Sequence, residues 1–444
     1  MAAKPRTQRP TATTLEENDV AATRNKYNGD PFGNEEGKKV KYKTLTWPQT
    51  GFIMIAETIS LGILSLPSVL AAVGLVAGII LIIGLGIIAT YTGYVLGQFK
   101  IKYPYVHTMG DAGQILAGAW GREICGIAQT TFLVFIMGSH VLTFSIMMNV
   151  LTNHSLCTIW FMIIGTAISF ICTLPRTLKS VSHLSVISFA SVVAAIMITM
   201  IGVGLRGRPA GIMIENTTDV SFDKAFIGFM NIVFAYGTYY AFTSFGVALY
   251  SLQISDTCLY LIAAVVIYYY TGKDVASPAL GSTGPLLRKI AYGIASPTII
   301  IAGVINAHVA AVCFDVSILK KGTNNHLGSG SFFSNLVWVI ILLILWVIAW
   351  VIAEAIPSFN HLLALISSLF VSWFTYGISG AMWLHINKGQ LFKNWKKKAL
   401  TIINFSICVM GIVITVLGLF ASGKAIHDDT DGSLGAFSCN DNSI

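Results

Sequence analysis

The chain has 444 residues, of which 55% are hydrophobic and only 11% are charged, and its mean hydropathy is +0.72. Charged residues make up about a quarter of soluble domains, so this composition excludes an ordinary soluble protein and predicts one embedded in lipid. The net charge of +8 does not predict a nucleic-acid partner, because most basic residues lie in short segments between apolar runs.

The two tails differ from the rest of the chain. Residues 1–44 are polar and poor in aromatic side chains, which predicts a largely disordered cytoplasmic tail. Four lysines between positions 38 and 43, followed by Trp47, predict an anchor at the membrane surface. Residues 45–421 form the predicted transmembrane domain, and residues 422–444 form a short acidic tail with no assigned role.

Apolar runs of about twenty residues recur along residues 45–421, and each can cross a hydrocarbon core of about 30 Å. Backbone amides in lipid have no water to bind, so these runs are expected to be helical. The sequence therefore predicts an all-α polytopic membrane protein whose partners are the lipid bilayer and a small molecule. Its eleven predicted transmembrane helices are 49–72, 74–99, 123–151, 156–174, 184–205, 225–249, 254–272, 289–316, 332–353, 359–385 and 398–421.

The distribution of basic residues predicts the orientation of these helices. With a cytoplasmic N-terminus, the inside segments hold 21 of the 28 Lys and Arg residues, as the positive-inside rule requires. The glycosylation sequons at Asn153 and Asn216 then fall in outside loops, whereas the sequon at Asn404 falls within a helix. We expect an integral membrane protein with an outside C-terminus, in the plasma membrane in preference to the vacuolar membrane.

The seven cysteines show no CxxC or CxxH spacing, so no metal site is predicted. Cys157 and Cys439 are the two that this topology places on the oxidising side, but spacing alone does not determine whether they pair. The chain also contains no HExxH or GxSxG motif, and no enzymatic activity is predicted. Asp256 is placed near the end of its predicted helix and receives no role.

The first predicted helix contains the segment ETISLGILSLP, residues 57–67, in which polar and helix-breaking residues interrupt an apolar run. Gly62 weakens a helix, and Pro67 cannot donate a hydrogen bond to the carbonyl of residue 63. We expect two half-helices joined by an unwound stretch, whose free amides attract a carboxylate and whose free carbonyls attract an ammonium. An ordinary kink is the alternative, since Gly and Pro are frequent in membrane helices.

The sixth predicted helix contains a comparable segment, FAYGTYYAFTSFG, residues 234–246. Transporters built from inverted repeats place interrupted helices at matching positions of their two halves. Helices one to five and six to ten are therefore predicted to form two repeats, and the eleventh helix is additional. A zwitterionic amino acid fits between two such facing segments.

The segments 56–82, 263–311 and 345–380, which include ETISLGILSLP, YYYTGKDVASPALGS and AEAIPSFNHLLALISS, resemble fungal neutral amino acid permeases of the amino acid/auxin permease family. The resemblance extends over residues 29–419. It implies a LeuT-type arrangement of five plus five helices with one extra helix, and secondary active uptake of amino acids. It also implies a substrate site formed by Thr58, Ser60, Gly62 and Ile63 of the first helix and by Phe234, Ala235, Tyr236 and Gly237 of the sixth.

One segment departs from the family pattern. Family members usually carry a polar loop with an acidic residue and prolines after the sixth helix, whereas residues 244–255 here contain neither charge nor proline. Because a few residues can join antiparallel helices, we expect the fold to be retained. An inactive splice variant or a non-transporting amino acid sensor on the same fold is the alternative function.

The predicted function is proton-coupled symport of neutral L-amino acids by alternating access, without a cofactor. Neither interrupted segment supplies a basic residue, or an acidic one beyond Glu57, that could pair with a charged substrate side chain. Burial favours the protonated form of a carboxylate, so Glu57 is the first candidate proton carrier and His308 the second. Alternatively, Glu57 stays charged and pairs with a Lys or Arg. Sodium is the second candidate ion, held by carbonyls around Ile59 and by the hydroxyls of Ser296 and Thr298.

Overall fold

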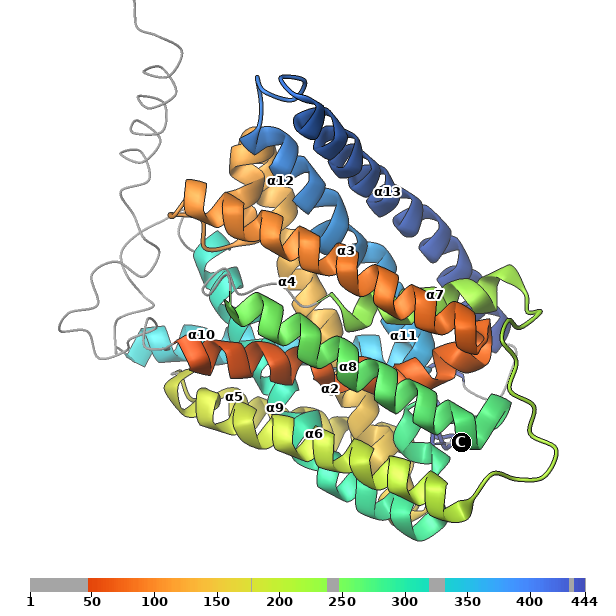
Figure 1. The fold of residues 1–444 in the computed structure, drawn as a ribbon. Coiled ribbons are helices and arrows are strands. Elements are labelled where there is room, and N and C mark those ends of the chain that lie inside the picture. Colours follow the sequence, from red (N-terminus) through yellow and green to blue (C-terminus); the bar gives the residue numbers. More distant parts are fainter. Residues whose placement is uncertain (1–46, 177, 238–246, 319–331, 431–434, 444) are drawn as a thin grey trace, which may run out of the picture.

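The computed structural model describes residues 47–176, 178–237, 247–318, 332–430 and 435–443, and within these ranges every regular element is a helix (Figure 1). The predicted disordered tail, with its lysine-rich anchor, lies outside the described residues. The elements in chain order are α2 (Trp47–Val73), α3 (Leu75–Lys102), α4 (Met109–Thr152), α5 (Thr158–Thr173), α6 (Leu178–Arg206), α7 (Phe222–Ala235), α8 (Val247–Thr271), η1 (Gly272–Asp274), η2 (Ala279–Ser282), α9 (Pro285–Ile318), α10 (Phe332–Ala355), α11 (Phe359–Ile366), η5 (Ser367–Gly377), α12 (Ile378–Ile386) and α13 (Trp395–Thr430).

Nine helical segments of the described residues are long and apolar enough to cross a membrane. One of them, Phe359–Ile386, joins α11, the π-helical η5 and α12 without a break. Two shorter helices, α5 with 16 residues and α7 with 14, complete the order of eleven helices that the sequence predicts. The predicted class, an all-helical polytopic membrane protein, is confirmed.

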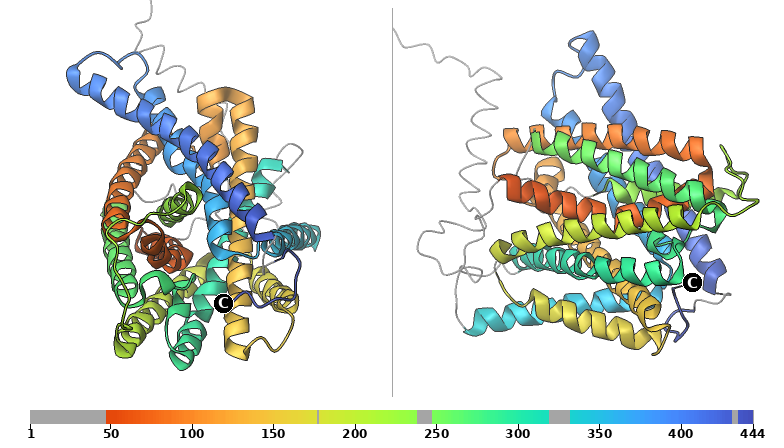
Figure 2. Two further views of the ribbon diagram at one scale, coloured as in Figure 1. Left: turned by 90° about the vertical axis from the view of Figure 1, so that its right-hand side faces the viewer. Right: turned by 60° about the horizontal axis from the view of Figure 1, so that its bottom comes forward.

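The helices run between two ends of the molecule, as the right-hand view of Figure 2 shows. We call one the basic end, because Lys102 there donates to the Ile386 carbonyl and Arg176 donates to Ser334 at the start of α10. We call the other the disulfide end, where loops 153–157, 207–221 and 272–284 and the segment 435–443 lie. An ion pair between Lys273 and Glu215, with 2.6 Å between Nζ and Oε1, joins two of these loops.

The contacts between helices relate the two halves of the chain. The first helices of the halves, α2 and α7, pack against each other, and so do the third helices, α4 and α9. Because each half contains five spans, the two halves run in opposite directions, as an inverted repeat requires. The additional helix α13 packs along η5 and α7. This pairing supports the predicted order of five plus five plus one.

The start of α4 differs from the predicted helix 123–151. Thr108 and Asp111 form a capping box that starts the helix, and Gly118, with a φ of 69°, reverses its direction. The first limb packs back on the second, since the Met109 amide donates to Gln129 Oε1 at 2.9 Å. The prediction missed the first limb of this helical hairpin, which is visible at the basic end in Figure 2.

The predicted boundary between helices six and seven is wrong. The helix that the sequence extends to residue 249 ends at Ala235, and α8 starts at Val247 and passes without interruption through residues 250–255. Those residues contain no proline or glycine, and Leu249, Leu252, Asp256 and Tyr260 are buried at helical spacing. Residues 238–246, the remainder of the second interrupted segment, lie outside the described residues.

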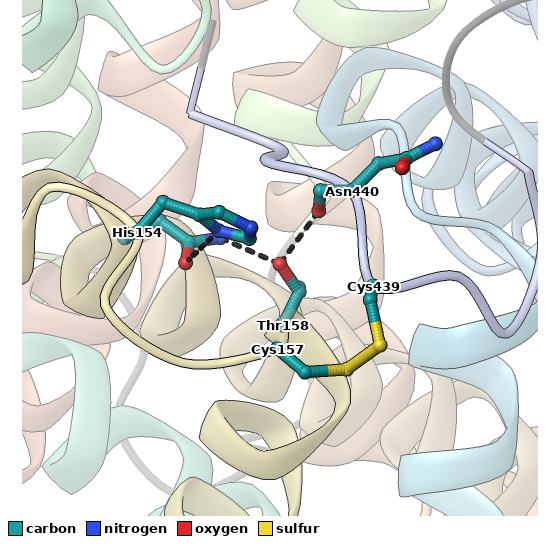
Figure 3. Close-up of a disulfide and its surroundings, with 6 residues drawn as sticks. His154, Cys157, Thr158, Cys439 and Asn440 are labelled. Atoms are coloured by element: carbon teal, nitrogen blue, oxygen red, sulfur yellow. Dashed lines mark hydrogen bonds between the residues drawn. A yellow bond between two sulfur atoms is a disulfide. The ribbon is translucent and has the colours of Figure 1, made fainter.

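The C-terminal region is attached to the helices at the disulfide end. Helix α13 continues to Thr430, nine residues beyond its predicted end. Figure 3 shows the following segment crossing the loop between α4 and α5, where a disulfide joins Cys157 to Cys439. Thr158 donates to the Asn440 carbonyl at 2.6 Å, and the buried Asn442 carboxamide bonds Ser145 and Asn149 of α4 at 2.8 Å each. The sequence left this pairing open and assigned the tail no role.

Candidate functional site

The segment ETISLGILSLP is helical throughout, since α2 runs from Trp47 to Val73 with Pro67 inside it. The predicted unwound stretch in the first helix is therefore wrong. Hydroxyls of the segment bind carbonyls of their own helix: Thr58 Oγ1 donates to Met54 at 2.7 Å, and Ser65 Oγ donates to Gly62 at 2.9 Å. Helices α6, α7 and α8 pack around α2, so the helix is supported where proline removes one hydrogen bond.

The end of α7 lies directly on α2 at Gly62. A Cβ added to Gly62 would lie 2.9 Å from Ala235 Cα, so only glycine permits this approach. Ala235 ends α7, and the chain turns there, with the Gly237 amide donating to the Phe234 carbonyl at 2.9 Å. The helix termination expected in the second segment is thus present, next to a continuous α2.

The structure brings most of the predicted substrate residues into one buried junction between α2 and α7. Phe234, which is partly buried, packs against the surrounding core. The other seven predicted substrate residues are buried: Thr58, Ser60, Gly62, Ile63, Ala235, Tyr236 and Gly237.

Tyr260 of α8 connects the two sides of this junction. Its hydroxyl lies 2.7 Å from the Thr58 carbonyl oxygen and 3.0 Å from the Ala235 carbonyl oxygen and donates to both. The Tyr236 and Tyr260 rings meet edge to face, with centroids 5.5 Å apart, and the Tyr236 hydroxyl lies 3.1 Å from Thr257 Oγ1. Sequence reasoning missed Tyr260, because nothing in the aromatic run of that helix distinguishes it from Tyr268.

Asp256 lies one helical turn before Tyr260, at the tenth position of α8. Its side chain is fully buried, and neither carboxylate oxygen has a hydrogen-bond partner among the described residues. The sequence placed it near a helix end only because it placed the start of that helix too late. An ionisable side chain within a membrane helix is a functional candidate, so Asp256 joins the list of candidate residues.

Three hydroxyls meet beside the junction, from α2, α6 and α9. Ser188 and Thr298 lie 2.9 Å apart, and Ser60 and Thr298 lie 3.5 Å apart, measured between their hydroxyl oxygens. Ser296 does not join them, because it donates to the Gly293 carbonyl of its own helix. Of the two predicted sodium ligands, only Thr298 faces α2, and Ser188, which the sequence did not single out, takes the other place.

Glu57 is held by α9. Its Oε2 accepts a hydrogen bond of 2.6 Å from Asn306 Nδ2, and its buried Oε1 has no partner among the described residues. Within those residues no Lys or Arg pairs with Glu57, so the predicted alternative of an ion pair finds no support there. His308 is separate from this contact, because its ring packs on Trp338 of α10 at 5.8 Å between centroids. The two predicted proton carriers are not adjacent.

Comparison with known proteins decides the family. The sequence model of the family described as transmembrane amino acid transporter protein matches residues 43–421. The chain belongs to this family. The N amino acid transport system protein of Neurospora crassa is 35% identical over 416 residues, which cover 88% of this chain and 87% of that protein. Two proteins called transmembrane transporter, from Gibberella moniliformis and Fusarium pseudograminearum, are 28% and 26% identical, each covering 91% of this chain and 89% of its own length.

In this amino acid transporter family member, the junction of α2, α7 and α8 is closed. Ala235 fills the space beside Gly62, and the Tyr260 hydroxyl occupies backbone carbonyls of both α2 and α7. A ligand that binds those carbonyls must displace the Tyr260 hydroxyl.

Proposed function

We propose that this protein is a secondary active transporter that takes up neutral L-amino acids together with protons by alternating access. The observation that carries the proposal is the α2–α7 junction, in which the buried carbonyls of Thr58 and Ala235 both face the Tyr260 hydroxyl. Two backbone acceptors from different helices suit an amino acid ammonium. The relative named as an N amino acid transport system protein supports amino acids as the substrate class.

The surroundings of the junction disfavour an acidic side chain on the substrate. The described residues that meet there are aliphatic, aromatic or hydroxylated, apart from the acidic Asp256 and Glu57. An acidic substrate would bring a second buried negative charge without a basic partner, which is costly in a low-dielectric site. We propose that the substrates of this family member are neutral amino acids.

The two ends of the molecule support an orientation. Basic segments stay in the cytoplasm by the positive-inside rule, and disulfides form in oxidising compartments. The basic end, with Lys102 and Arg176, therefore faces the cytoplasm in our proposal, and the Cys157–Cys439 end faces the outside. We propose the plasma membrane in preference to the vacuolar membrane.

For the coupling ion we propose the proton, carried by Glu57, because the Oε1 atom of Glu57 is buried without a partner among the described residues. The second candidate ion is sodium. Sodium binds oxygen ligands, and three hydroxyls lie together here, those of Ser60, Ser188 and Thr298. His308 remains the second candidate carrier.

The test is uptake of radiolabelled leucine by purified protein in proteoliposomes, with and without an inward proton gradient and with and without sodium. We expect accumulation that requires the proton gradient and is displaced by unlabelled neutral amino acids. Equal displacement by lysine or glutamate would contradict neutral specificity, and accumulation driven by sodium alone would contradict proton coupling. Leucine binding without uptake is the result expected of a sensor, and neither binding nor uptake is expected of an inactive variant.

A further inference from the structure

The Tyr260 hydroxyl binds two backbone carbonyls that another hydrogen-bond donor could bind instead. We propose that the Tyr260 hydroxyl is an internal stand-in for the substrate ammonium: it occupies the Thr58 and Ala235 carbonyls in the closed junction and yields them when an amino acid binds. This inference rests on the proposed transport of amino acids and adds a positioning residue to it.

The two acceptors differ, because the Thr58 carbonyl lies within the continuous helix α2 whereas the Ala235 carbonyl lies at the end of α7. Ala235 is the last residue of α7, where helix carbonyls lack an intrahelical partner. A buried carbonyl without a donor is unfavourable. The Tyr260 hydroxyl supplies that donor from α8, at 3.0 Å, while it also lies 2.7 Å from the Thr58 carbonyl oxygen of α2.

One hydroxyl serves both carbonyls incompletely, because it has a single proton to share between them. An ammonium has three donors and a positive charge, so it satisfies both carbonyls at the same time and more strongly. Asp256 lies four residues before Tyr260 on the same face of α8, fully buried.

Gly62 makes the arrangement sterically feasible. A Cβ at this position would lie 3.3 Å from the Tyr260 hydroxyl as well as 2.9 Å from Ala235 Cα. The missing side chain thus lets both groups approach the α2 backbone. When an ammonium displaces the hydroxyl, α8 loses its hydrogen bonds to the α2 and α7 carbonyls, and the closed contact loosens. The substrate then opens the junction by exchange of one donor for another.

Tyr260→Phe tests this inference, because it removes the hydroxyl and keeps the ring that packs on Tyr236. We expect leucine to bind purified protein about fivefold more tightly, equivalent to about 1 kcal/mol, because the Ala235 carbonyl then lacks its donor from α8 in the closed state. Net uptake should slow, since the substrate-free transporter needs the closed contact to return, while leucine exchange should persist. A purely structural role would weaken binding and slow exchange together.

The matched control is Tyr268→Phe. Tyr268 is buried in the same helix, and its hydroxyl has no hydrogen-bond partner among the described residues, so affinity should stay unchanged. A second probe is 4-methylpentanoate, which lacks the amino group of leucine. Its affinity should not improve in Tyr260→Phe, because it brings no donor for the two carbonyls.

The outcomes separate the inference from the function on which it rests. If the unmodified protein transports leucine but Tyr260→Phe binds it equally or more weakly, the role of Tyr260 is wrong and transport stands. If the unmodified protein neither binds nor transports amino acids, the proposed function itself fails. Should Tyr260→Phe not reach the membrane, Tyr260→Met also lacks the hydroxyl and its flexible side chain fills space well, and it must show the same tightening.

Discussion

The α2–α7–α8 junction and the disulfide end both join segments that are distant in the sequence, but they do so by different means. At the junction, close packing at Gly62 and the hydrogen bonds of Tyr260 make the connection. At the disulfide end, a covalent bond joins Cys157 to Cys439, and side-chain hydrogen bonds of Asn442 reinforce it. In our proposal the first connection exchanges its partners within the bilayer, whereas the second is covalent. We therefore expect motion at the junction, against α4 and α5 as a fixed support.

The largest expected effect is that of Gly62→Leu, which forces a side chain into the α2–α7 contact. Even a single Cβ would lie 2.9 Å from Ala235 Cα, so the junction cannot close and uptake should be abolished at normal surface level. The control is Gly84→Leu on α3, where a Cβ would have no neighbour within 4 Å. Both variants are measured by leucine uptake after surface biotinylation. Normal uptake by Gly62→Leu would contradict the claim that transport requires the close α2–α7 contact at Gly62.

Glu57→Gln tests whether the junction is coupled to protons. The variant keeps a side chain able to bond Asn306 but cannot change its charge. We expect loss of accumulation driven by a pH gradient and retention of leucine exchange, measured in the same proteoliposomes. Glu123→Gln, an exposed position near the tip of the α4 hairpin, is the control. If Glu57→Gln still concentrates leucine under a pH gradient, another group carries the proton.

Cys439→Ser tests the covalent side of the comparison. Removing a disulfide that closes a long loop costs about 2–4 kcal/mol, so the midpoint of thermal unfolding should fall by several degrees while uptake at moderate temperature continues. Treatment with a reductant should lower the midpoint of the unmodified protein equally and leave Cys439→Ser unaffected. Cys258→Ser, a free and exposed cysteine, is the control. Loss of uptake at unchanged stability would make the disulfide end part of the moving machinery.

The smallest expected effect concerns the ion pair between the partly buried Glu215 and the exposed Lys273. Exposed ion pairs contribute little to stability, so Lys273→Gln should hardly change the unfolding midpoint at neutral pH. The hydrogen bond from Lys273 lowers the pKa of the Glu215 carboxyl. A group with a lowered pKa stabilises at neutral pH and loses that contribution as the pH falls through the lowered pKa. Any difference between the two proteins should thus vanish at acidic pH. A difference that grows on acidification would contradict this origin.

Local sequence determined the class of the protein and most of its helices. Whether a run such as 332–353 or 398–421 spans the bilayer depends on its own length and apolar character, and α10 and α13 cover both runs. The family could also be identified from the sequence, because the match to the family extends over residues 43–421. The sequence did not predict the hairpin at the start of α4, because the reversal at Gly118 depends on how the two limbs pack.

Only the tertiary structure decided whether α2 remains helical at Gly62 and Pro67. These residues permit a break but do not require one, and the packing of α6, α7 and α8 around α2 accompanies an intact helix. The same holds for Tyr260, whose partner Thr58 lies 202 residues away, and for Cys157, whose partner lies 282 residues away. The sequence by itself predicted a membrane-spanning protein, and the family resemblance implied eight substrate residues, whereas Tyr260, Asp256 and Ser188 were found only in the structure. Which of them touch depended on contacts between distant helices, because hydrogen-bond partners are chosen by proximity in space and leave no periodic pattern in the chain.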